Sequence, residues 1–179
     1  MSFVTIRIEK DGVAGITRSA LGDVGRAAVR RPALLWWRKF LPIHFTNRAS
    51  NRYGYAPRSG EPGSGRAFRG SYSEAKLKRK KIAGVQAIGE VKPLVWSGRS
   101  RERATSSPNI ETVAQNFRSF EARVILDVPA LNFKPRLREE LIADYESEIQ
   151  AMNRSFDRAF ELELNKLGRT RHAVKTIRG

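Results

Sequence analysis

The chain has 179 residues, with 34 lysines and arginines against 18 aspartates and glutamates, so its formal net charge at pH 7 is +16. Cysteine is absent, which excludes disulfides and thiolate metal sites, and no apolar run reaches the ~18 residues of a membrane-spanning helix. The N-terminal residues lack the pattern of a secretory signal. We therefore expect a protein that folds in a reducing cytoplasm, away from membranes and without cofactors.

The charge is distributed unevenly along the chain. Residues 137–168 carry eight acidic and four basic side chains, whereas the segments before and after them are basic. An acidic segment in a cationic chain favours either a nearby polyanion or contacts between copies of the chain.

The N-terminal third predicts one strand followed by helices. Apolar and polar residues alternate over 4–9, as in a half-buried strand, and apolar residues recur at helical spacing over 13–29. Pro32 suits the first turn of a second helix, which Pro42 should kink or restart. His44 follows that kink, and we expect it to be a polar residue on a partly buried helix, without a catalytic role.

Residues 51–73 are predicted to be a loop, because glycine, proline and serine dominate them. Arginines alternate there with four aromatic residues that a flexible linker would not normally carry, and we expect the loop at about 56–72 to become ordered only against a partner. These aromatic anchors are Tyr53, Tyr55, Phe68 and Tyr72.

A short helix is predicted over 74–82, with Ser73 as its N-cap. Together with nearby loop arginines, it supplies cations that could contact nucleic acid phosphates or the acidic helix of a neighbouring copy, and the sequence does not distinguish these two interpretations. The set comprises Arg58, Arg66, Arg69, Lys76, Lys78, Arg79, Lys80 and Lys81.

The middle of the chain predicts an antiparallel meander. The apolar run 93–98 ends in a Ser-Gly break and suits a buried strand. Charged and small residues then alternate over 99–104, and further strands are expected over 110–115 and 120–126.

The strongest helical pattern runs from 137 to 167, where apolar residues recur at steps of four and three over about 45 Å. Gly168 is expected to end this helix, and 169–179 to form a basic tail. Glu140, Asp144 and Glu148 share one face of it, which we interpret as a solvated or intersubunit acidic surface. The predicted fold is therefore α+β: one domain over 1–168, with an antiparallel sheet of three to four strands packed against the helices.

No catalytic motif is present. The chain has no phosphate-binding loop, no HExxH, no GxSxG and no cysteine nucleophile, so we expect a protein that is not an enzyme.

Four pieces of the sequence follow one another in a set order. They are an aromatic-basic run over 36–46, an aromatic-Gly-aromatic loop over 52–58, the pair Tyr72 and Lys76, and a Pro-Leu-Val turn ending in Ser-Gly over 93–98. In this order they resemble the neck or tail-completion (head-tail joining) proteins of tailed bacteriophages. The residues that carry the resemblance most clearly are Trp36, Phe40, Pro93, Leu94, Trp96 and Gly98.

The resemblance implies a non-enzymatic α+β protein of the virion, assembled in the host cytoplasm into a homo-oligomeric ring. Its expected neighbours are portal or adaptor proteins on one side and tail-terminator or tail-tube proteins on the other, with DNA in the channel as a further candidate partner. A different class also fits the charge, namely a cytoplasmic nucleic-acid-binding protein that acts as a monomer.

Overall fold

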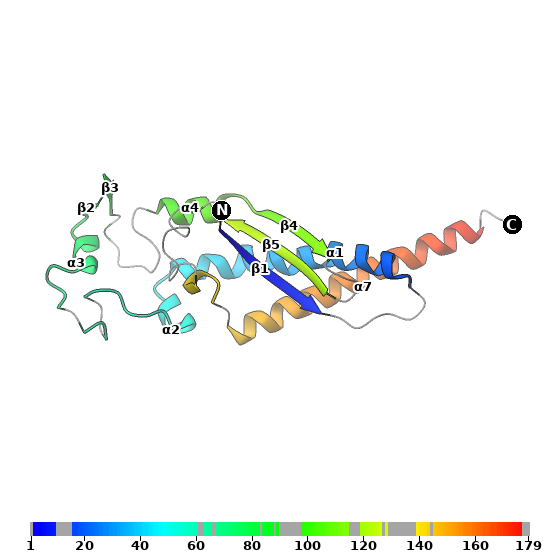
Figure 1. Cartoon of the computed structure of the whole chain (residues 1–179), viewed down its shortest axis with the longest axis horizontal. Helices are drawn as coiled ribbons and strands as arrows, with labels where there is room; N and C mark the ends of the chain where they lie inside the picture. Colours follow the sequence, from blue (N-terminus) through cyan, green and yellow to red (C-terminus); the bar gives the residue numbers. More distant parts are fainter. Residues whose placement is uncertain are drawn as a thin grey trace. The chain divides into compact units, whose positions relative to one another are not determined.

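The computed structural model has an α+β fold, in which helices accompany a three-stranded antiparallel sheet and a separate two-stranded hairpin (Figure 1). The α+β prediction is therefore confirmed. The structure describes residues 2–9, 16–60, 63–65, 67–82, 84–87, 89, 98–114, 119–126, 128, 139–143 and 145–176.

The chain contacts group into two compact units. The first contains Met1–Ser2, Trp37–Pro108 and Leu126–Tyr145, and the second contains Phe3–Trp36, Asn109–Ile125 and Glu146–Gly179. Each unit is described separately below, and the prediction of one domain stays a prediction.

The sheet of the second unit has the strand order β1-β5-β4, with β5 in the centre. The strands are β1 (Ser2–Glu9), β4 (Asn109–Ala114) and β5 (Ser119–Leu126), and β4 pairs antiparallel with β5 from Asn109↔Ile125 to Ala114↔Phe120. The strands predicted from alternation over 4–9, 110–115 and 120–126 are thus confirmed. Because β5 is central, most of its residues on both faces are buried.

A charged residue lies within this central strand. Glu121 is 2 % exposed, and its carboxylate accepts hydrogen bonds from Arg123 at 2.7 Å and from Arg7 of β1 at 3.3 Å. A buried carboxylate needs such partners, since an unpaired buried charge is costly. These contacts let a polar position occupy the sheet interior.

Helix α1 (Arg18–Leu35) begins at Thr17, whose hydroxyl accepts a hydrogen bond from the Ala20 amide at 3.3 Å. The prediction that Pro32 starts a new helix is wrong, because Pro32 lies inside α1. A proline there removes one backbone donor, usually at a cost of about 3 kcal/mol. Burial of Pro32 beside other buried residues of α1, such as Val29 and Ala33, offsets that cost.

Helix α7 (Glu146–Thr176) has 31 residues, and its bounds differ from the prediction at both ends. It starts after a short helical segment at 139–141 and a turn at 142, and it continues through Gly168 into the segment predicted as a tail. A single glycine costs a helix only about 1 kcal/mol, which strong helix formers around it can offset.

The core of the second unit forms where α1 and α7 meet the sheet. The ring of Phe120 lies 5.9 Å from that of Phe156 and 6.2 Å from that of Phe160, both on α7. Gly25 of α1 approaches the same ring so closely that a Cβ atom would overlap it. Both helices therefore cover the face of the sheet that carries Phe120, as predicted.

The first unit is built from short elements. The π-helical turn η1 (Trp36–Phe40) leads into the 3-10 helix η2 (Leu41–Phe45), where Pro42 occupies the first turn, in agreement with the predicted restart. The short helix α2 (Ala49–Tyr53) follows, and Gly54 ends it in the left-handed conformation at φ 64°. The described residues from 55 to 70 then form turns and irregular structure.

Two predictions for this unit are wrong. Helix α3 (Tyr72–Leu77) starts earlier than expected, because Ser71 and not Ser73 is its N-cap and accepts a hydrogen bond from the Glu74 amide at 3.1 Å. It also ends before the lysine run is complete, and β2 (Lys81–Ile82) pairs with β3 (Val85–Gln86) in a hairpin.

The segment after Gly98 is likewise not a strand. It forms helix α4 (Arg99–Ser106), which starts at Gly98 in the left-handed conformation. Its alternation of arginine with smaller residues resembles a strand pattern, but only Ala104 is buried, so no apolar face holds it in a sheet. The indole of Trp37 donates a hydrogen bond to the Ala104 carbonyl at 2.9 Å and ties α4 to η1.

Candidate functional site

The first unit contains a buried cluster of three rings around His44. This side chain is 0 % exposed, and its ring stacks on Tyr53 with centroids 4.0 Å apart and planes 7° from parallel. The Tyr55 hydroxyl forms a hydrogen bond with Nδ1 of His44. The expectation that these two tyrosines await an external partner is therefore wrong, since their rings pack on His44 within the unit.

Burial keeps His44 neutral. The pKa of His44 is lowered to about 4, mainly because the ring is removed from water. A hydrogen bond with the backbone of Glu140 opposes this shift, and the nearby charge of Arg52 contributes to it. The histidine is thus an uncharged structural residue at neutral pH. The sequence signal for it is the aromatic-Gly-aromatic motif at 53–55, which lies close enough in the chain to fold back on η2.

The lowered pKa predicts a stability that depends on pH. The unfolded chain takes up a proton on His44 near pH 6.5, whereas the folded protein does so only near pH 4, so stability falls as the pH drops between these values. We expect a loss of about 2 kcal/mol between pH 7 and pH 5 from this group. Urea unfolding of the wild type and of His44→Gln over this range measures it, and an equal pH slope in both would contradict the assignment.

Arg58 and Glu140 form an ion pair beneath the surface of the same unit. Arg58 Nη1 donates to Glu140 Oε1 at 2.9 Å, Nη2 pairs with Oε2, and the two side chains are 16 % and 9 % exposed. The predictions that Arg58 contacts DNA or a partner and that Glu140 contacts a neighbouring copy are therefore corrected. Arg58 and Glu140 instead form an ion pair with each other within the unit.

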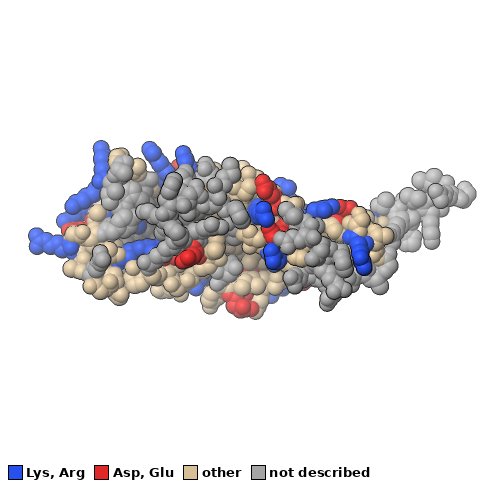
Figure 2. Space-filling view, in the orientation of Figure 1, with Lys and Arg blue, Asp and Glu red and all other residues tan. Residues whose placement is uncertain are grey.

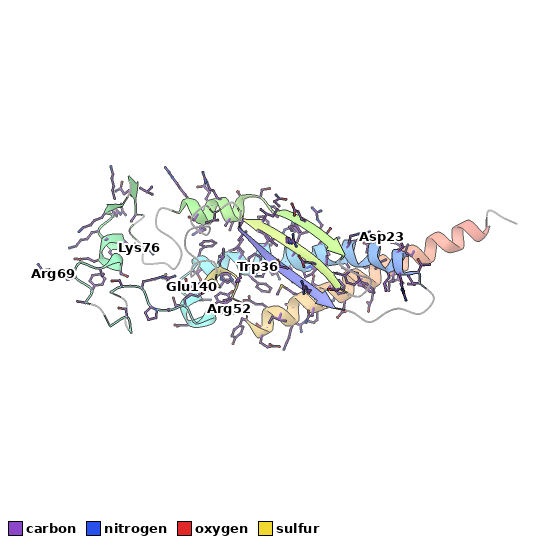
Figure 3. All side chains as sticks on the ribbon, viewed as in Figure 1. Asp23, Trp36, Arg52, Arg69, Lys76 and Glu140 are labelled. Carbon is purple, nitrogen blue, oxygen red and sulfur yellow. The ribbon has the colours of Figure 1, made fainter. Side chains whose placement is uncertain are left out.

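A pocket of about 780 Å³ opens beside this region. Its lining includes Ile43 of η2, Arg48 at the N-cap of α2, Arg52 within α2, and Tyr145. Arg52 is labelled in Figure 3. The guanidinium of Arg52 lies 4.7 Å from the centroid of the Tyr145 ring and 5.8 Å from that of Tyr53. Cation–π contacts on two rings hold this arginine in one place.

Cations gather over α3, the β2–β3 hairpin and α4, as Figure 2 shows. Of the predicted basic set, Lys76 is an exception because it is 3 % exposed and so cannot serve a surface contact in this conformation. Arg66 lies outside the described residues. The exposed members of the set are Arg69, Lys78, Arg79, Lys80 and Lys81.

The predicted acidic face of the long helix is not an exposed surface. Glu140 is 8 % exposed and precedes α7, Glu148 is 0 % exposed, and Asp144 lies outside the described residues. The prediction that these residues share one face of the long helix is wrong for Glu140, which precedes α7, and Glu148 lies on the buried side of that helix. Charged residues normally indicate the exposed face of a helix, and the spacing alone does not show that Glu148 is on the buried face.

The remaining predicted residues divide between core, surface and the part of the chain that is not described. Trp36 is fully buried and Phe40 half-buried, whereas Phe68 is 47 % exposed. Tyr72 begins α3 and Gly98 precedes α4. Pro93, Leu94 and Trp96 lie outside the described residues, so the buried strand predicted over 93–98 stays a prediction.

Within the described ranges, no group of three or more histidine, cysteine or acidic side chains is arranged to hold a metal ion. The helices in those ranges also include none long and apolar enough to cross a bilayer. No protein-family model matches the chain, and neither the curated proteins nor the solved structures contain a match to it.

Proposed function

We propose that the chain is a structural virion protein: a ring-forming subunit of a tailed-phage neck that joins the capsid portal to the tail. Two kinds of observation support this. The ordered sequence pieces over 36–98 resemble the neck and tail-completion proteins, and the geometry of α7 leaves a helical surface suited to another protein.

The end of α7 carries the structural part of the proposal. None of the described side chains over 161–167 is buried, although leucines continue at 162, 164 and 167. Leu162 is 61 % exposed, the highest value among the exposed large hydrophobic residues. In Figure 1 the last turns of α7 extend past α1 and the sheet of the same unit. Leu162 lies on a different side of α7 from Leu164 and Leu167, so leucines without a buried position occur on more than one side of the helix here. A helix end that is apolar on several sides favours contact with a neighbouring subunit.

Replacing Leu162 with glutamate is therefore expected to dissociate the assembly while leaving the subunit folded. An exposed leucine contributes little to the stability of the isolated chain, but a charge buried in an interface is strongly unfavourable. Sedimentation velocity should show the mass falling to that of the single chain, with an unchanged melting temperature.

Asn153→Glu is the matched control, because it adds the same charge at an exposed position on the opposite side of α7. It should assemble like the wild type. If Leu162→Glu also assembles normally, this surface is not the interface.

A second function is favoured by the exposed cations on α3, the hairpin and α4, namely binding of nucleic acid by a cytoplasmic monomer. Such a protein would bind duplex DNA or RNA through many phosphate contacts and lose affinity steeply as salt rises. A ring subunit whose cations contact portal or tail proteins would instead keep its assembled mass without nucleic acid.

A further inference from the structure

The pocket beside α2 has the composition of an anion site. Arg48 and Arg52 both line it. Arg48 is the N-cap of α2 and Arg52 lies within that helix, so their spacing of four residues places them on the same side of it. None of the described lining residues is acidic. An anion that enters the pocket would therefore meet two guanidinium groups and no opposing carboxylate from that lining.

The pocket also offers planar surfaces. Tyr145 is 46 % exposed, and the guanidinium of Arg52 lies against its ring at 4.7 Å. The guanidinium of Arg52 also lies 5.8 Å from the ring of Tyr53, and that ring is stacked on the buried His44. The Arg52 guanidinium thus contacts two tyrosine rings, one of which is stacked on a buried histidine.

We propose that this pocket binds a nucleotide unit, with the phosphate held by Arg48 and Arg52 and the base stacked against Tyr145. Arginine suits phosphate because its donors form paired hydrogen bonds with two oxygens, and both tyrosine rings and guanidinium planes stack on bases. The volume of about 780 Å³ lies within the range usual for small-ligand sites.

Two further lining residues suit the same ligand. Asn47 and Asn51 carry amides that can both donate and accept hydrogen bonds, as base edges and sugar hydroxyls require. An acidic peptide would satisfy the charge of the arginines but would make no use of the exposed part of the Tyr145 ring. The observations therefore favour a nucleotide over a carboxylate side chain.

The site does not rest on the proposed ring function. The same chemistry could come from a free mononucleotide or from one nucleotide of a single strand, and the experiment separates these sources. Full-length protein is titrated by calorimetry with adenosine monophosphate, a short oligodeoxythymidine, inorganic phosphate and an aspartate-rich peptide. Tighter binding of the mononucleotide indicates the first source, and tighter binding of the oligonucleotide the second.

Variants at the pocket locate the binding. Arg48→Ala should weaken binding of the tighter nucleotide probe about tenfold, the loss typical of one charge-assisted contact. Tyr145→Leu should weaken it at least about fivefold, whereas Tyr145→Phe keeps the ring and should bind like the wild type. Both positions are exposed, so folding should be retained, and melting temperatures check this. Arg103→Ala is the charge-matched control on α4, outside the pocket lining.

Four results would overturn the proposal. The first is no saturable binding of either nucleotide probe, and the second is equal binding by wild type, Arg48→Ala and Tyr145→Leu. The third is that inorganic phosphate binds as tightly as the mononucleotide. The fourth is that the peptide binds more tightly than both nucleotide probes. Repeating the titration with Leu162→Glu separates this result from the ring proposal. Loss of assembly there should leave nucleotide binding unchanged, and failure to bind nucleotide would not affect the measured mass of the wild type.

Discussion

Replacing Phe120 with alanine is expected to destabilise the protein by about 4 kcal/mol, the cost typical of removing a large buried aromatic side chain. The ring is 0 % exposed and contacts both Phe156 and Phe160 of α7 and the backbone of α1 at Gly25. Its removal leaves a cavity that three elements share. Urea unfolding followed by circular dichroism measures the change in the free energy of unfolding.

The close approach at Gly25 gives this prediction an internal check. Gly25→Ala should destabilise the wild type, since the added Cβ overlaps the Phe120 ring, but in the Phe120→Ala background the methyl group has room and should stabilise α1 by up to about 1 kcal/mol. Gly22→Ala is the control, because no heavy atom lies within 4 Å of its Cβ position. It should stabilise both backgrounds. Additive effects of Gly25→Ala and Phe120→Ala would contradict the described packing.

Removing the charge of Glu140 is expected to cost about 3 kcal/mol. In Glu140→Gln the guanidinium of Arg58, 16 % exposed, stays largely buried but loses the carboxylate that neutralises it. The double variant Arg58→Met/Glu140→Leu should recover most of this loss, since apolar side chains of similar volume avoid the desolvation of both charges. The free energy of unfolding of the three proteins decides between these outcomes.

The surface pair of Glu163 and Lys166 on α7 serves as the control. Its side chains are 29 % and 69 % exposed and their charged atoms are 2.6 Å apart. Glu163→Gln should cost no more than about 1 kcal/mol, because water screens an exposed pair. Equal losses from Glu140→Gln and Glu163→Gln would show that the Arg58–Glu140 pair is not buried in solution.

The strands and the two long helices could be predicted because each has a periodic apolar pattern of sufficient length. Alternation located β1, β4 and β5, and the stripe through Met152, Phe156 and Phe160 located most of α7. The ends of these elements were harder to predict. Pro32 and Gly168 normally break helices, yet burial and neighbouring helix formers keep both α1 and α7 continuous.

Short elements and long-range pairs could not be predicted for a different reason. In α4 the alternation of arginine with smaller residues indicated a strand, but only Ala104 is buried, so the segment lacks the apolar face that would hold it in a sheet. The pair of Arg58 and Glu140 joins positions 82 residues apart, so no local pattern indicates it. The pocket likewise depends on Tyr145 coming to lie beside Arg52, a contact that only the folded unit provides.

The native mass of the purified, unmodified protein distinguishes the proposed ring from a monomer. Native mass spectrometry, in buffer treated with nuclease and at moderate salt, should give a single species that contains several copies of the 20.2 kDa chain. That species should persist without nucleic acid. A particle of 20.2 kDa at all concentrations, acquiring higher mass only when DNA or RNA is added, would contradict the ring and favour the nucleic-acid-binding monomer.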